Sequence, residues 1–171
     1  MRDPRPHVGE PLAVDLLNTR WMSADGPRDL LIDLDGLRCW LTVNDLSDSV
    51  PDERTRHALL STRDAIRRAV CEDAFEELNR ILDHGRIRRV LTAAGPAEHP
   101  DVPRSEWLAA WLAADNLLQL LAERPGRIKQ CAHPQCVLFF YDTSKNGTRR
   151  WHSMAACGNR AKAARHYARK S

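Results

Sequence analysis

Three cysteines and one histidine near the C-terminus have the types and the spacing of a metal site. They form two close pairs, Cys131 with Cys136 and His152 with Cys157, and four residues separate the members of each pair. Structural zinc takes four tetrahedral ligands from Cys and His, commonly as two such pairs. The apolar segment between them, residues 137–141, would pack as a strand beside the metal in a domain too small for a full core. The sequence therefore predicts a closed Cys3His zinc site.

Other uses of these residues fit less well. Three of the five cysteines fall inside residues 131–157, which unrelated free thiols would not be expected to do. His133 is a rival ligand to His152, but it lies inside the first pair, where it would compete with both flanking cysteines. A catalytic zinc needs an open position and a general base, whereas four protein ligands leave the metal saturated. Asp142, the one carboxylate nearby, suits a turn at the strand end far better than acid–base chemistry. Because no paired-carboxylate or nucleophile pattern stands out elsewhere, we expect no enzymatic activity.

The charges change sign just before this cluster. Residues 1–126 hold 16 Lys and Arg against 22 Asp and Glu, whereas residues 127–171 hold 10 against 1. We take these two segments as domains, and the basic one as the candidate nucleic-acid surface, because it attracts a polyanion that the acidic one repels. After Cys157 the chain is rich in Ala and helix-prone, which predicts a basic helix. The residues expected to contact nucleic acid are Arg149, Arg150, Arg160, Lys162, Arg165 and Arg169.

We call the basic domain, residues 127–171, the finger. The N-terminal domain must position the finger, and the apolar residues of the N-terminal domain follow a helical pattern. Apolar residues recur at helical spacing over five segments, residues 12–23, 35–43, 51–72, 74–83 and 105–124. Over residues 86–103 the period disappears, and Gly95-Pro96 and Pro100 indicate an irregular connection with at most a short strand at 90–93. The predicted fold class is mainly α: a multihelical domain followed by a small finger with a short strand and a basic helix.

Three polar residues of the helical domain are candidates for lining an effector pocket. Asn18 and Thr19 end the first predicted helix, and Asn79 interrupts an apolar face between Leu78 and Ile81. Hydrogen bonding at helix ends is the simpler account of all three.

The composition indicates the compartment in which the protein is expected to reside. No run approaches the ~18 apolar residues that span a bilayer, and the residues after Met1 do not have the pattern of an export signal. An odd number of cysteines in such a chain favours metal ligation over disulfides. Arg outnumbers Lys by 22 to 4, as in proteins from GC-rich bacterial genomes. We expect a soluble, cytoplasmic, bacterial protein with no membrane partner.

The same residues resemble a known family. The segments 127–131, 139–142, 149–151 and Cys157-Gly-Asn-Arg160 are similar to the CGNR zinc finger, which is named after the last of them. Upstream, residues 12–19 resemble the opening motif of the ABATE domain that usually precedes this finger. Together the two resemblances cover nearly the whole chain.

The resemblance implies a helical domain of stress-induced transcription regulators joined to a zinc finger that binds DNA. It also implies Cys131, Cys136 and Cys157 as zinc ligands, with His152 in place of the family's usual third cysteine. Imidazole in place of thiolate keeps tetrahedral zinc but removes one negative charge, so we expect a more acid-sensitive site.

The predicted function is that of a DNA-binding transcription regulator with a structural zinc finger and a basic helix. Its helical domain would bind a small-molecule effector or form a homodimer. The main alternative is a zinc-stapled interaction module, whose basic helix binds an acidic partner or the acidic domain itself. A small enzyme with its site in the helical domain is a third reading. Salt-dependent DNA binding separates the first reading from the second.

Overall fold

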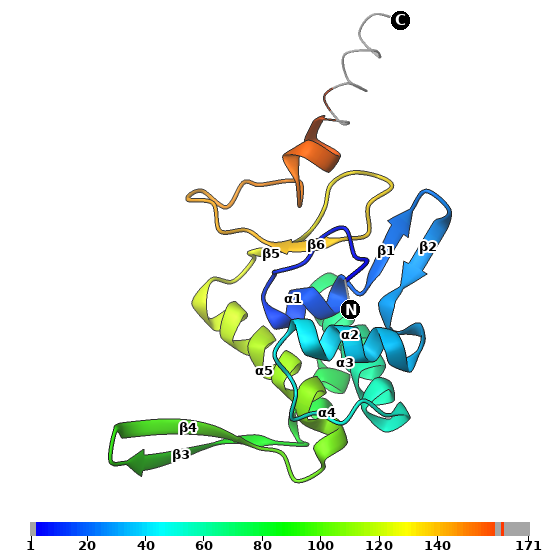
Figure 1. Cartoon of the computed structure of the whole chain (residues 1–171). Coiled ribbons are helices and arrows are strands. Elements are labelled where there is room, and N and C mark those ends of the chain that lie inside the picture. The colour runs from blue at the N-terminus through cyan, green and yellow to red at the C-terminus, as the bar shows by residue number, and fades with distance from the viewer. Residues whose placement is uncertain (1–2, 160–161, 163–171) are drawn as a thin grey trace, which may run out of the picture.

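A computed structural model describes residues 3–159 and residue 162 of the chain (Figure 1). Helices make up 46% and strands 18% of it, and the described residues contain three two-stranded sheets. The fold is therefore mixed, and the expectation of a mainly α protein was wrong. The basic helix predicted after Cys157 lies outside the described residues, except for Lys162.

Five α-helices follow the predicted helical segments closely, except at the end of the first. They are α1 (Leu12–Leu17), α2 (Leu34–Val43), α3 (Glu53–Glu72), α4 (Glu76–Leu82) and α5 (Leu108–Glu123). The side chains of Asp33 and Asp52 cap α2 and α3 by accepting from the backbone N–H of Gly36 and Thr55, at 2.8 Å each. Short helical turns lie at Leu30–Ile32, Ser105–Trp107 and Met154–Gly158.

Two antiparallel hairpins stand where the sequence analysis expected a helix end and an irregular loop. The first joins β1 (Arg20–Ser23) to β2 (Gly26–Asp29), and the second joins β3 (Arg86–Thr92) to β4 (Gly95–Asp101). In each hairpin, a glycine with positive φ closes the turn, a backbone conformation that other residues rarely adopt. These glycines are Gly26, with φ of 115°, and Gly95, with φ of 114°.

Each hairpin escaped prediction for a physical reason. Trp21 stands four residues after Leu17, so β1 continues the helical apolar stripe in sequence although the helix ends at Leu17. The β3–β4 hairpin projects from the body and is mostly exposed on both faces, so it carries no alternating apolar pattern (Figure 1). Pro96 and Pro100 are tolerated in β4 because it is an edge strand.

The helices share one apolar core. Trp40, Leu59 and Leu117 are fully buried in it, and the small residues Ala109, Ala110, Ala113 and Ala114 line the inner face of α5. The third sheet pairs β5 (Ile128–Gln130) with β6 (Phe139–Tyr141), and Phe139 and Tyr141 belong to the same core. The finger is thus seated on the helical body through β6 (Figure 1). Among the described residues, no helix has both the length and the apolar character to cross a membrane.

Candidate metal centre

The four predicted ligands come together in the structure. The Sγ atoms of Cys131, Cys136 and Cys157 and a ring nitrogen of His152 all lie within 4.8 Å of one another. Cys136 Sγ and His152 Nδ1 are 3.5 Å apart. Bonds of about 2.0–2.3 Å from a tetrahedral zinc place its ligand atoms roughly 3–4 Å apart, so this arrangement fits a single ion.

Tight backbone turns present the two pairs of ligands. The Cys136 N–H donates to the His133 carbonyl at 2.9 Å, which closes a turn between the first two cysteines. Ser153 Oγ accepts from the Ala156 N–H at 3.2 Å and caps the turn that carries Cys157. The Ala132 N–H donates to the Arg150 carbonyl at 2.8 Å and so ties one turn to the other. The rival His133 stays outside the cluster, and its Nδ1 accepts from the Gln135 N–H at 3.3 Å.

The electrostatics of the cluster favour a bound cation once the thiols are deprotonated. Burial, together with the neighbouring thiols of Cys131 and Cys157, raises the pKa of Cys136 to about 12. Thiolates packed this closely repel one another, and a bound metal ion offsets that repulsion. The donor set, its burial and its geometry therefore all fit zinc.

The finger is joined to the helical body by reciprocal hydrogen bonds. The Asn18 side chain donates to the Phe139 carbonyl at 3.0 Å and accepts from the Phe139 N–H at 2.8 Å. Glu10 accepts from the Tyr141 N–H at 2.8 Å and also pairs with His7, whose ring lies 5.0 Å from that of His152. The N-terminal segment therefore reaches the edge of the metal cluster.

Comparison with known families agrees with this arrangement. Residues 10–124 match the ABATE family, whose description is "Putative stress-induced transcription regulator". The chain belongs to the ABATE family. Residues 127–170 match the CGNR zinc finger, in the order that the sequence analysis expected. A search of curated proteins found no match.

Zinc is the cofactor of this ABATE protein, as both the finger match and the four-residue cluster indicate. Cys131, Cys136, His152 and Cys157 would hold the ion. A metal with four protein ligands crosslinks the two turns and supplies cohesion that the small finger cannot obtain from burial alone.

A buried carboxylate supports the finger next to the metal cluster. Asp142 is fully buried and accepts from Lys129 Nζ at 2.8 Å, Ser144 Oγ at 2.6 Å and the Arg149 N–H at 3.0 Å. Burial by itself raises the pKa of Asp142, but Lys129 and Ser144 outweigh it and hold the pKa well below its usual range. Arg127 donates to the Asp142 and Ser144 carbonyls and fixes the same loop. Asp142 is thus committed to structure.

The residues predicted to contact nucleic acid differ in how exposed their side chains are and in whether they already form hydrogen bonds. Arg149 is half-buried: its guanidinium donates to the carbonyls of Trp151 and His152 and lies 4.6 Å from the centre of the Phe140 ring. Arg150 is exposed beside the Trp151 ring, and Lys162 is exposed. Arg160, Arg165 and Arg169 lie outside the described residues. Lys145, which the sequence analysis did not single out, is exposed on the same finger.

The residues suggested for an effector pocket do not come together. Asn18 is buried in the junction with Phe139. Thr19 is buried and accepts from Arg63 Nη1 at 2.7 Å, whereas Asn79 is exposed on α4. Sequence reasoning gave no role to Arg127 and Lys129, and it gave Asp142 only a turn-forming role. All three stand in segments that resemble the family motif, which was the one signal available for them.

Proposed function

We propose that this protein is a transcription regulator that binds DNA through its zinc finger and the basic segment after it, and that it has no catalytic activity. The charge division carries the proposal: residues 127–171 have 10 basic side chains and one acidic side chain. The acidic one, Asp142, is buried and paired, so it does not oppose a polyanion at the surface. Membership of a family of putative stress-induced transcription regulators supports the same function.

The exposed cations of the finger suit contacts to phosphate. Lys145, Arg150 and Lys162 are exposed, whereas Arg127, Lys129 and Arg149 hold backbone carbonyls. The finger and the turn at Met154–Gly158 lie at the opposite end of the molecule from the β3–β4 hairpin (Figure 1). DNA could approach this end without meeting the acidic helical body. Each phosphate contact releases counterions, so the affinity should fall steeply with salt.

The absence of catalysis is part of the proposal. A four-ligand zinc set leaves no open position for a reacting water. Asp142, the carboxylate nearest to the cluster in sequence, is held as an ion pair by Lys129 at 2.8 Å and does not serve as a general base.

Fluorescence anisotropy with a labelled duplex tests DNA binding by the zinc-loaded protein. We expect binding at low ionic strength whose affinity falls linearly on a log–log plot against salt. Substitution K162A/R165A/R169A should weaken it at least tenfold and lower the slope by about 2–3, since each lost phosphate contact contributes roughly 0.9. The control R54A/R68A/R88A removes three exposed arginines from α3 and the β3–β4 hairpin and should leave both values unchanged.

Two outcomes would overturn the proposal. One is no salt-dependent binding of any duplex by the zinc-loaded protein. The other is equal weakening by the two triple variants, because a diffuse charge effect would then replace a docking surface. Binding of an acidic peptide with DNA binding absent would support the protein-interaction alternative.

A further inference from the structure

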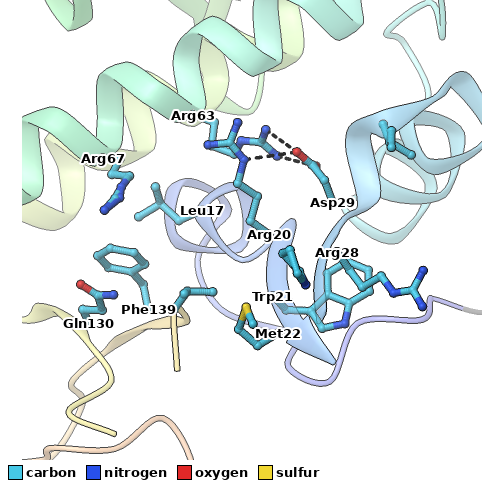
Figure 2. Close-up of a pocket in the computed structure, with 13 residues that line it drawn as sticks. Leu17, Arg20, Trp21, Met22, Arg28, Asp29, Arg63, Arg67, Gln130 and Phe139 are labelled. Atoms are coloured by element: carbon cyan, nitrogen blue, oxygen red, sulfur yellow. Dashed lines mark hydrogen bonds and ion pairs between the residues drawn. The ribbon is translucent and has the colours of Figure 1, made fainter. Parts of the chain in front are cut away.

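A cavity of about 380 Å³ lies where the β1–β2 hairpin, α3 and the finger meet (Figure 2). Pockets of this size accept small organic ligands. The helical domain and the finger both contribute to its wall: α3 provides Arg63 and Arg67, and the finger provides Gln130, Val137 and Phe139. A ligand in this cavity would therefore touch both parts of the protein.

Apolar side chains line the cavity on two sides. Figure 2 shows Leu17 and Phe139 close together on one side and Trp21 and Met22 on the other. Three apolar side chains of the lining remain in water: Met22 is 46% exposed, Val137 38% and Ile32 73%. Exposed apolar groups gathered around one opening favour a ligand with an apolar body that would cover them.

The polar side chains that line the cavity are mostly basic. Arg20, Arg28, Arg63 and Arg67 line it, and Asp29 is the one carboxylate among the lining residues. Asp29 is fully used: Arg63 Nη1 and Nη2 contact its two oxygens at 2.7 Å each, and Arg20 Nε adds a bond at 3.2 Å. Arg20 also pairs with Asp64 at 3.1 Å and Arg28 pairs with Asp25, so among the described residues Arg67 is the one of these four arginines without a carboxylate partner.

One of these arginines retains donors for a ligand. Within residues 3–159, the Arg67 side chain forms no ion pair, unlike Arg20 and Arg63. Figure 2 shows Arg67 and Gln130 on either side of the Phe139 ring.

We propose that this cavity binds a small organic monoanion, a carboxylate carried on an aromatic or similarly flat apolar body. Arg67 would hold the carboxylate, and the apolar body would lie against Phe139, Leu17 and Trp21. A monoanion fits better than a phosphate dianion because Arg20 and Arg63 are already engaged with Asp29, and Arg28 pairs with Asp25 at 3.1 Å. Arg67 is therefore the guanidinium left to neutralise a ligand charge.

Such a ligand would tighten the junction between the helical domain and the finger. Gln130 ends β5, one residue before the zinc ligand Cys131, and Phe139 begins β6. Binding energy shared across the junction stabilises the arrangement in which both walls are present. This conclusion does not depend on DNA binding, so it can be tested and can fail separately.

Calorimetry with the zinc-loaded full chain tests the proposal with 2-naphthoate as the probe and 2-naphthamide as its uncharged match. We expect naphthoate to bind at least tenfold more tightly than the amide. R67A should weaken naphthoate at least tenfold, since a charge-assisted pair to carboxylate is lost. R68A removes the neighbouring exposed arginine, which does not line the cavity, and should change nothing.

Tryptophan indole resonances give a second readout that does not depend on heat. The Trp21 signal, identified with W21F, should shift on naphthoate binding, whereas the signal of buried Trp40 should not. Equal affinity for the acid and the amide, or an unchanged affinity in R67A, would overturn the proposal. Displacement of naphthoate by inorganic phosphate at equal concentration would also overturn it, because the guanidinium groups would then serve a phosphate.

Discussion

The helical body and the finger are stabilised by different means. The body buries Leu, Ile, Trp and Ala side chains from five helices in one continuous core. The finger buries few apolar groups of its own, and Arg127, Lys129 and Asp142 satisfy its loops by hydrogen bonding. Four metal ligands draw its two turns together. Burial suffices for a domain of the body's size, whereas a short segment needs crosslinks.

The strand β6 belongs to the finger and also packs in the apolar core of the body. Phe139 and Tyr141 face the apolar core, and Phe140 is buried on the side of Arg149. Asn18 then fixes Phe139 through two hydrogen bonds. The comparison predicts that the finger can be unfolded while the body persists, and that damage at β6 affects both.

Removal of zinc should have the largest effect. A chelator should abolish amide-exchange protection across residues 131–157, because structural zinc contributes about 10–16 kcal/mol in small fingers. Helices α3 and α5 should keep their protection, since their core does not include the metal ligands. Hydrogen exchange read by mass spectrometry checks both parts. Unchanged protection of the finger after complete metal loss would refute a metal-dependent fold.

Loss of the Asp142 carboxylate should come next. D142A removes the carboxylate that accepts from Lys129 and the Ser144 hydroxyl, and we expect about 3 kcal/mol of destabilisation in the zinc-loaded finger. S144A removes one donor and should cost about 1 kcal/mol. Denaturant titration with exchange measured in the finger gives both values. Equal effects of the two variants would mean that the carboxylate is not the centre of this network.

The junction should be weaker than either part. N18A removes both hydrogen bonds to Phe139, and we expect about 2 kcal/mol of destabilisation, with faster exchange in β6. N79A makes the same substitution at an exposed position of α4 and should stay within about 0.5 kcal/mol. If N18A left β6 exchange unchanged, apolar packing alone would hold the finger on the body.

A pH dependence of the body should be the smallest effect. Burial raises the pKa of Asp29, but the hydrogen bonds from Arg63 outweigh it and leave the pKa below its ordinary value. The stabilisation is therefore present above the unfolded pKa of about 3.9 and is lost as the pH falls below it. Thermal unfolding of the chelated protein should show this acid loss, and D29N should reduce it. D25N, at the exposed hairpin turn, should behave like the unchanged protein.

The sequence predicted the parts whose signal is local. The metal ligands follow from their spacing, and four of the five helices follow from apolar periodicity and caps such as Asp52. A strand was predicted at 137–141, where β6 lies, and a short one was allowed at 90–93, inside β3, but the pairing of the three sheets was hidden. Their stability depends on partners that are remote or on turns without apolar alternation. Asn18 shows the limit most clearly. It looked like a helix end, and it is one, but its partner Phe139 is 121 positions away.

Charge at the finger shows the same limit. Composition alone treats Arg149 and Arg150 as equals, yet the first binds two carbonyls and the second is exposed. Only the folded loop shows which arginine is used in hydrogen bonds within the finger and which is exposed to a ligand. The separation of 10 basic residues from 22 acidic ones remained readable, because it does not depend on any single contact.

The placement of the five cysteines makes the protein a convenient reporter of its own metal content. Cys39 is buried in the core, three others are zinc ligands, and Cys71 is exposed at the end of α3. A thiol reagent should therefore titrate one group quickly in the loaded protein and four after chelation, with Cys39 following on full unfolding. A dye attached to Cys71 before chelation would mark the body at a single defined position.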